Sequence, residues 1–295
     1  MPTAPEQPAV ISVARSIRAL PARHALWLGV CLVAGLTACK AQPPAGEPSA
    51  TPAESAATSP ATTTAAAAPT AAAPVALSAE QLQAVVDGML RKAYGEKAFN
   101  ATTGCWSHSF EGANDTLDYC MKPDTPKVVA AASGTQVYFQ TYSDPNADTY
   151  SLVDPGLRGA FAATVTADGK WTPLAATAAI DQGQAGDCGC RDAQLVQVGP
   201  DRHGWLGTAG GTWQGVSVTQ YTLLVPINGT FRDVSRIAQS TEDSPSEVVK
   251  IQIDPTGTPV DGFYPIKATR QGDGAAAATS VIAFDPKQQV YPGAR

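Results

Sequence analysis

The pattern of hydrophobic and polar positions divides the chain into three parts. A short apolar run is followed by a stretch in which hydrophobic residues do not recur at a regular spacing, and then by a long part with helical and strand-like spacing. Residues 25–38 form the apolar run, which is fourteen residues long, whereas a helix that crosses a membrane needs about 20 apolar residues. Arg15, Arg18 and Arg23 precede the run and small residues end it, as in a secretory signal peptide. We therefore expect residues 1–38 to be removed from the mature chain.

The apolar run ends in Leu36-Thr37-Ala38-Cys39. This ending resembles the lipobox of bacterial lipoproteins. The resemblance implies that the Cys39 sulfur carries a diacylglyceryl group and that cleavage leaves its amine free for acylation. Each buried methylene of such chains contributes about 0.8 kcal/mol to membrane binding. Lys40 follows, not Asp, and by family analogy this favours the outer membrane, facing the periplasm. The alternative is an ordinary signal in which Cys39 has no role.

Residues 40–77 consist almost entirely of Ala, Pro, Thr, Ser and Gly, with few charges and no aromatic residue. Such a composition cannot build a hydrophobic core. As a flexible coil the segment would span roughly 35 Å, and as an extended polyproline-like chain about 118 Å. We expect residues 39–77 to be a lipidated cysteine followed by a disordered tether.

A helical pattern begins at Ser78. Ser78 and Gln81 have the spacing of a capping box, and apolar residues then recur every three or four positions up to Tyr94-Gly95. The apolar positions are Leu82, Val85, Val86, Met89, Leu90 and Ala93. The pattern predicts one amphipathic helix whose apolar face packs on the core.

After this helix the pattern becomes typical of strands. Short segments rich in β-branched and aromatic residues occupy 137–142, 161–166, 216–225, 248–253 and 280–284. Asp168-Gly169 and Asn228-Gly229 suit two-residue hairpin turns. We expect residues 78–295 to be one mainly-β domain, an antiparallel sandwich, barrel or small propeller-like meander, with one N-terminal amphipathic helix.

Charge narrows the range of partners. Without residues 1–38 the chain keeps 17 basic and 25 acidic side chains, a net charge of −8. This balance opposes binding to nucleic acid and to anionic headgroups. Apart from the membrane reached through the N-terminal lipid, it favours a basic protein partner.

Four cysteines remain once Cys31 is removed and Cys39 is lipidated. An even number in an oxidising compartment predicts disulfides. Three pairings are possible, and we favour Cys105 with Cys120 and Cys188 with Cys190, because local closure costs the least chain entropy. The alternatives are a metal site or a redox site at Cys188 and Cys190, although structural zinc sites use wider cysteine spacing.

Catalytic and metal signatures are sparse. His108 and His203 are the two histidines after residue 38, and a Ser/His/Asp triad is defined by geometry rather than by order. There is no G-x-S-x-G elbow, so no catalytic residue is assigned.

Asp144, Asn146 and Asp148 have the spacing that opens a calcium loop. A calcium loop also needs glycine at its sixth position and an acidic residue at its twelfth, and this stretch has neither. Calcium is the one cofactor candidate, and ordinary turns use the same residues.

Trp205 and Trp213 stand in a glycine-dense stretch, residues 203–215. Small neighbours would let the indoles project as partner-binding anchors. The alternative is that both tryptophans begin buried strands in which the glycines serve bends or bulges.

Together these features predict a membrane-anchored periplasmic lipoprotein whose β domain is a non-catalytic protein-binding or inhibitor module. In compartment, charge and fold class it is similar to the lipoprotein immunity proteins that protect a bacterial wall from secreted lysozyme-like toxins. That similarity implies a basic partner. The alternatives are a cell-envelope hydrolase that uses His108 or His203, and a purely structural envelope protein.

Overall fold

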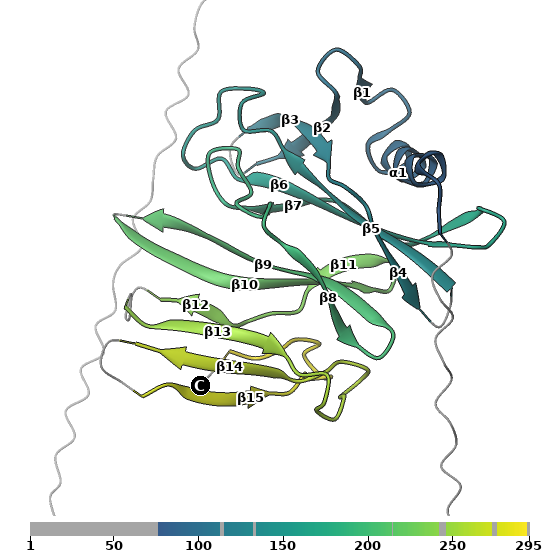
Figure 1. Ribbon diagram of the computed structural model, residues 1–295. Coiled ribbons are helices and arrows are strands. Elements are labelled where there is room, and N and C mark those ends of the chain that lie inside the picture. The colour runs from purple at the N-terminus through teal and green to yellow at the C-terminus, as the bar shows by residue number, and fades with distance from the viewer. Residues whose placement is uncertain are drawn as a thin grey trace, which may run out of the picture. The chain divides into compact units, whose positions relative to one another are not determined.

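The computed structural model describes residues 76–112, 115–131, 134–213, 215–241, 246–272 and 276–293. The predicted signal peptide, Cys39 and all but the last residues of the predicted tether lie outside this part. The described residues contain one helix and fifteen strands (Figure 1). This helix is too short and too polar to cross a membrane.

The helix is α1, Ala79–Tyr94. The predicted capping box is confirmed, because the Ser78 hydroxyl accepts from the Gln81 amide and the Gln81 side chain accepts from the Ser78 amide. Gly95 ends the helix with a positive φ of 109°. The buried face is the predicted one and consists of Val85, Val86, Met89 and Leu90.

Every strand pairing is antiparallel, and most neighbours in a sheet are also neighbours in sequence. Sheet 1 has the order β1-β2-β3-β5-β6-β7, with β4 paired to β5. Its strands are β1 Phe99–Asn100, β2 Cys105–Glu111, β3 Thr116–Pro123, β4 Lys127–Ala131, β5 Gly134–Ser143, β6 Gly156–Val165 and β7 Trp171–Gln182.

Sheet 2 has the order β11-β10-β9-β8, with β12 paired to β10, and sheet 3 has the order β13-β14-β15. The strands of sheet 2 are β8 Gln194–Gly199, β9 Arg202–Trp213, β10 Val216–Ile227, β11 Thr230–Asp233 and β12 Ala238–Ser240. Those of sheet 3 are β13 Val248–Ile253, β14 Ile266–Gln271 and β15 Ala278–Ile282.

Three hydrophobic cores fill the spaces between the helix and the three sheets. The first lies between α1 and sheet 1, the second between sheet 1 and sheet 2, and the third between sheet 2 and sheet 3. Sheets 1 and 2 are also joined by hydrogen bonds, since the Phe231 amide donates to the Thr177 hydroxyl at 2.8 Å. The expected mainly-β antiparallel meander is confirmed, as stacked sheets that do not close into a barrel over the described residues.

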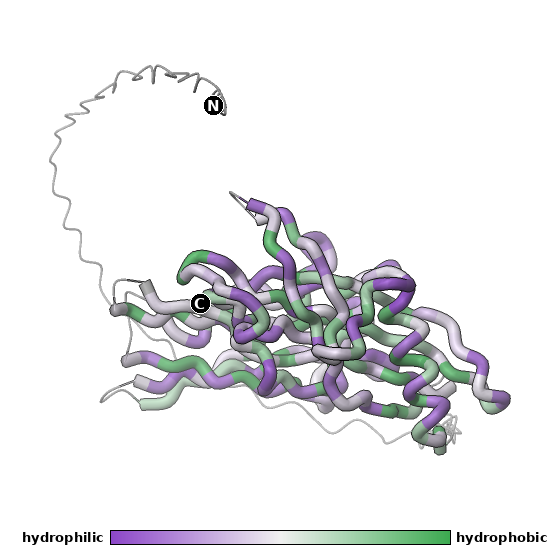
Figure 2. The backbone as a smooth tube through the Cα atoms, turned by 90° about the horizontal axis from the view of Figure 1, so that it is seen from above, coloured by the Kyte–Doolittle hydropathy of each residue, from purple (hydrophilic) through white to green (hydrophobic). Residues whose placement is uncertain are grey.

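Burial on both faces explains why several strands show no alternation. In β5, Val137 and Phe139 face α1 while Tyr138 faces sheet 2. In β10, Leu223 and Val225 face sheet 3 while Leu224 faces sheet 1. Strands covered on both sides read as continuous apolar runs. Figure 2 shows hydrophobic and hydrophilic stretches alternating along the described backbone.

The predicted two-residue turn at Asn228-Gly229 is confirmed. Asn228 and Gly229 have φ of 51° and 82° and join β10 to β11, and positive φ at both central residues matches the right-handed twist of the flanking strands. The turn between β6 and β7 is longer than predicted: Gly169 has φ of 79° but Asp168 has no positive φ, and the Thr166 amide donates to the Lys170 carbonyl at 2.9 Å.

The surface role predicted for Trp205 is wrong. The stretch from Arg202 to Trp213 is strand β9, and Trp205 is 1% exposed within the core between sheets 1 and 2. The glycines allow close packing: a Cβ at Gly204 would lie 2.5 Å from the Val225 side chain. Trp213 is the last residue of β9, opposite Val216, and its side chain lies outside the described part.

Arg158 on β6 is also fully buried in this layer. Its Nε donates to Gln140 Oε1 at 2.5 Å, Gln140 donates to the Tyr142 hydroxyl, and that hydroxyl donates to Asp124. Burial lowers the pKa of Arg158 to about 10. A chain of hydrogen bonds thus connects a buried cation to a carboxylate nearer the surface.

Candidate protein-binding surface

Two disulfides organise one end of sheet 1. Cys105 is bonded to Cys120, which joins β2 to β3, and Cys188 is bonded to Cys190 in a buried loop. This is the pairing that the sequence favours. All four described cysteines are therefore oxidised, and no group of three or more His, Cys, Asp or Glu in the described ranges is placed to hold a metal.

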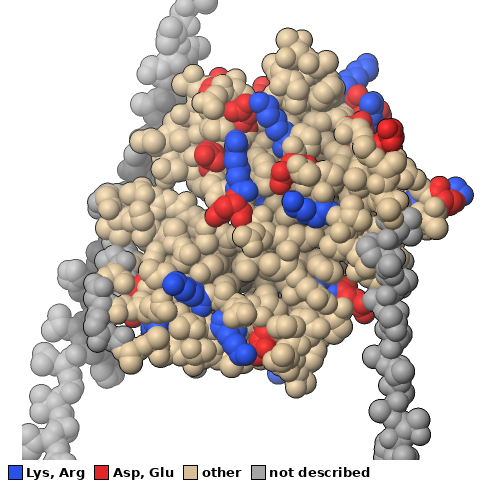
Figure 3. Space-filling view, viewed as in Figure 1, with Lys and Arg blue, Asp and Glu red and all other residues tan. Residues whose placement is uncertain are grey.

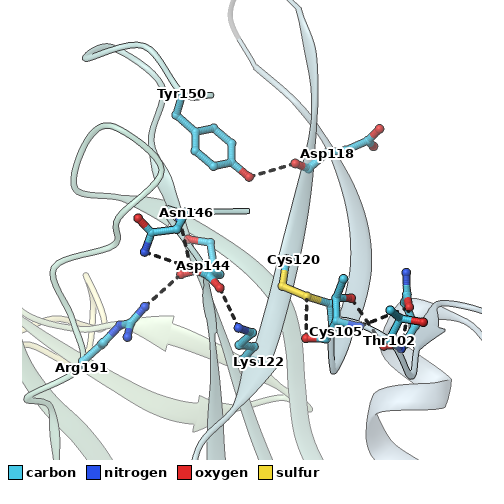
Figure 4. Close-up of a disulfide and its surroundings, with 12 residues drawn as sticks. Thr102, Cys105, Asp118, Cys120, Lys122, Asp144, Asn146, Tyr150 and Arg191 are labelled. Carbon is cyan, nitrogen blue, oxygen red and sulfur yellow. Dashed lines mark hydrogen bonds and ion pairs between the residues drawn. A yellow bond between two sulfur atoms is a disulfide. The ribbon is translucent and has the colours of Figure 1, made fainter. Parts of the chain in front are cut away.

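The connection between β5 and β6, residues 144–155, lies beside the Cys105–Cys120 disulfide (Figure 4). Tyr150 stacks on Tyr119 with ring centroids 5.0 Å apart. The Tyr150 hydroxyl donates to the Asp118 carbonyl at 3.0 Å, and the Tyr119 hydroxyl donates to the Pro155 carbonyl at 2.7 Å. Two tyrosines therefore fasten this connection to β3.

The loop that contains the Cys188–Cys190 disulfide also contacts the connection between β5 and β6. The Gly186 amide donates to the Asp154 carbonyl at 3.2 Å, and the Ser143 hydroxyl donates to the Gly186 carbonyl at 2.6 Å. A Cβ at Gly186 would lie 2.2 Å from the Tyr150 ring, so only glycine fits there. The connection is held on two sides by well-ordered contacts.

Its tip nevertheless presents two large aliphatic side chains to solvent. Leu152 is 77% exposed and Val153 is 83% exposed, the highest values among the large hydrophobic residues described. The flanking turn is closed by Asp154, whose carboxylate accepts from the Ser151 amide at 2.6 Å while its own amide donates to the Ser151 carbonyl at 3.1 Å. The backbone under the exposed pair is therefore fixed.

Acidic side chains surround this tip. A hollow of about 590 Å³ beside Val153 is lined by Glu111, Asp115, Asp154 and Asp181, with no basic residue in its lining. We call Leu152, Val153 and these four carboxylates the acidic loop surface. Burial above all, with smaller contributions from Tyr150, Asp154 and Asp181, raises the pKa of Tyr119 to about 12.

Elsewhere the charges are mixed. The face of the molecule in Figure 3 carries basic and acidic side chains in small groups, separated by uncharged surface. Described ion pairs such as Lys267–Asp254 at 3.0 Å and Arg270–Glu247 at 2.9 Å place a basic partner beside an acidic one. The hollow beside Val153, in contrast, has four acidic residues and no basic residue in its lining.

The calcium candidates lie in a second hollow, beside the Cys105–Cys120 disulfide. There the Asp144 carboxylate accepts from Lys122 Nζ at 2.6 Å and from the Asn146 amide at 3.0 Å (Figure 4). The Lys122 bond, above all, lowers the pKa of Asp144. Asp148 accepts from the Thr149 amide at 2.7 Å. These side chains shape the turn and form an ion pair, and calcium binding by them stays a prediction.

The two histidines do not form a triad with any described residue. His108 lies on β2 with its ring 5.3 Å from that of Tyr94, and His203 lies on β9 with a buried Nδ1 that has no hydrogen-bond partner in the described ranges. Burial lowers the pKa of both imidazoles. Among the described residues no hydrogen bond joins either histidine to a serine or a carboxylate, so the hydrolase alternative stays a prediction.

Sequence reasoning missed Leu152 and Val153. The available signal was an adjacent aliphatic pair inside a run of turn-forming residues, Ser151-Leu-Val-Asp-Pro155, where no strand or helix pattern accounts for it. Comparison of the chain with protein-family models, with curated proteins and with solved structures gives no match.

Proposed function

We propose that this chain is a membrane-anchored periplasmic lipoprotein whose β domain binds a basic protein without catalysis, as an inhibitor of a secreted wall hydrolase would. The observation that carries the proposal is the acidic loop surface, where a fixed backbone holds Leu152 and Val153 at 77% and 83% exposure. The lipobox-like ending at Cys39 supports the anchor, and the two disulfides suit an oxidising compartment.

The energetics of association favour such an arrangement. A partner that covers Leu152 and Val153 removes apolar surface from water, at about 25 cal/mol per Å². Because the Ser151–Asp154 turn is already formed, little entropy is lost on ordering it, and preorganisation of this kind raises affinity. The four surrounding carboxylates would steer a basic partner and set its orientation.

The anchor is tested by Cys39→Ala. Without the thiol no diacylglyceryl group can be attached, so we expect the protein to move from the membrane pellet to the soluble fraction of the envelope. Fractionation followed by immunoblotting measures this shift, and Cys31→Ala, which lies within the predicted signal, is the matched control. An unchanged membrane fraction for Cys39→Ala would overturn the lipid anchor.

The binding surface is tested by the double change Leu152→Ser with Val153→Ser. We expect the variant to lose at least tenfold in capture of a basic protein from detergent-solubilised envelopes and secreted material, because the apolar contact at the centre of the surface is removed. Capture by the unchanged protein should weaken as salt is raised, since the carboxylates are exposed.

Val281→Ser is the matched control, because Val281 on β15 is 64% exposed and lies outside the acidic loop surface. Substitutions at such exposed positions, in the control and in the double variant, change the free energy of unfolding by less than about 0.5 kcal/mol. Loss of capture by the double variant would therefore not result from unfolding. Equal capture by the double variant and the control would exclude the acidic loop surface as the contact.

A further inference from the structure

A third cavity, of about 380 Å³, is lined by strands of sheets 1 and 2 and by segments next to the strands of sheet 3. Its walls come from β5, β7, β9 and β10, from the turn at residues 260–263 and from the C-terminal segment after β15. The volume falls within the range of about 300–1,000 Å³ that is usual for small-molecule sites. The proposed protein-binding role does not use this cavity.

Unusual backbone conformations gather at the cavity. Four non-glycine residues in the described ranges have a positive φ, and three of them, Asn228 at 51°, Asp261 at 51° and Gln289 at 56°, line it. They belong to three separate turns, one after β10, one within residues 260–263 and one after β15. Residues held in sparsely populated regions of φ and ψ cluster at ligand sites.

The rim of the cavity holds an arginine without an ionic partner. The Arg202 guanidinium lies 4.7 Å above the Phe263 ring, and a Cβ at Gly262 would come within 3.2 Å of its Nε. Asp261 also lines the cavity, yet Arg202 has no ion pair or hydrogen bond with any described residue. A guanidinium presents its donors as a fork, which matches a carboxylate.

The lining combines apolar and polar side chains. Leu174, Ile227 and Phe284 contribute apolar surface, and His203 brings its Nδ1, which is buried and lacks a hydrogen-bond partner among the described residues. A ligand with an apolar body and a polar group fits such mixed walls. Asp201 and Asp261 on the rim would repel a ligand that carries more than one negative charge.

We propose that this cavity binds a small amphipathic monocarboxylate, with its apolar body between the sheets and its carboxylate on Arg202. The class follows from the apolar side chains of the lining, from a guanidinium without an ion pair among the described residues, and from the two rim carboxylates. Such a ligand would contact strands of sheets 1 and 2 and the turns next to sheet 3.

The test is calorimetric titration of the purified protein with three probes of one shape, 2-naphthoate, 2-naphthamide and 2-naphthylmethylammonium. We expect 2-naphthoate to bind about tenfold more tightly than 2-naphthamide, because a hydrogen bond to a charged group is worth that factor or more, and the ammonium probe to bind most weakly. Arg202→Gln should remove the difference between the first two probes, whereas the matched control Arg270→Gln, on β14 and ion-paired with Glu247, should preserve it.

Leu174→Trp, which fills the cavity, should abolish binding of all three probes, and circular dichroism of each variant checks that it is folded. Equal affinity for the three probes would show apolar partition without recognition. A preference for the ammonium probe would show that Asp201 and Asp261 dominate. Either result, or no binding of 2-naphthoate at millimolar concentration, would overturn the proposal.

Discussion

Trp205→Ala is expected to lower the free energy of unfolding by about 3–5 kcal/mol. The indole is 1% exposed and packs with Tyr138 and Leu224 between sheets 1 and 2. Truncation would leave a cavity that the hydrogen-bonded strands on either side cannot close. Denaturant unfolding of the oxidised protein, followed by circular dichroism, measures the loss.

Trp205→Phe is the matched control. It keeps an aromatic ring in the core and removes the indole Nε1, which is buried without a hydrogen-bond partner among the described residues. The expected loss is therefore smaller, about 1–2 kcal/mol. If Trp205→Ala left stability unchanged and weakened capture of a partner, the result would indicate that Trp205 is exposed and binds the partner.

The second large effect concerns the disulfides. Replacing Cys105 and Cys120 together by Ala should cost about 3 kcal/mol, because their bond closes a loop with a sequence separation of 15. Replacing Cys188 and Cys190 together should cost only about 1–2 kcal/mol by the same chain-entropy relation, since their separation is 2. All four residues are buried, so the difference between the two variants reports loop length.

Denaturant unfolding of both double variants measures these costs, and thiol titration of the unchanged protein before and after reduction counts the bonds. We expect no reactive thiol from these four residues before reduction. A larger cost for the Cys188 and Cys190 pair would mean that this bond chiefly supports the packing of its loop against Gly156, where a Cβ would lie 2.0 Å from the Cys188 amide nitrogen.

Local signals in the sequence predicted the elements whose conformation is decided locally. The Ser78 capping box depends on neighbouring residues, and the Asn228-Gly229 turn depends on two residues that tolerate positive φ. The strand expected over residues 248–253 is β13, in which Val249 is buried between the exposed residues Val248 and Lys250. In such cases the nearest neighbours carry most of the information.

Burial that depends on contacts with another sheet was harder to predict from the sequence. Periodicity cannot distinguish a strand covered on both faces from other apolar segments, so the stacking of three sheets does not follow from the pattern of β5 or β10. The glycines of β9 were ambiguous for a similar reason. Gly204 is required by the approach of Val225 from the neighbouring strand, and this contact has no local signature.

The sequence indicated the acidic character of the candidate surface but not its position. Net charge indicated a basic partner, but which carboxylates gather depends on how the β5–β6 connection lies against β3. Glu111, Asp154 and Asp181 come from three different parts of the chain. Their convergence results from the strand order of sheet 1, which no short motif encodes.

The position of α1 at the start of the fold has a mechanical consequence. A force applied through a lipid at Cys39 would enter the folded part at α1. In the described part of the chain the hydrogen bonds from α1 to sheet 1 come from the Tyr94 hydroxyl, at 2.7 Å from Thr141 Oγ1 and 2.8 Å from the Ala178 carbonyl. The remaining attachment is side-chain packing. Tension on the chain before Ser78 would therefore reach α1 first, and detachment of α1 would uncover the core residues Val137, Phe139 and Phe161 of sheet 1.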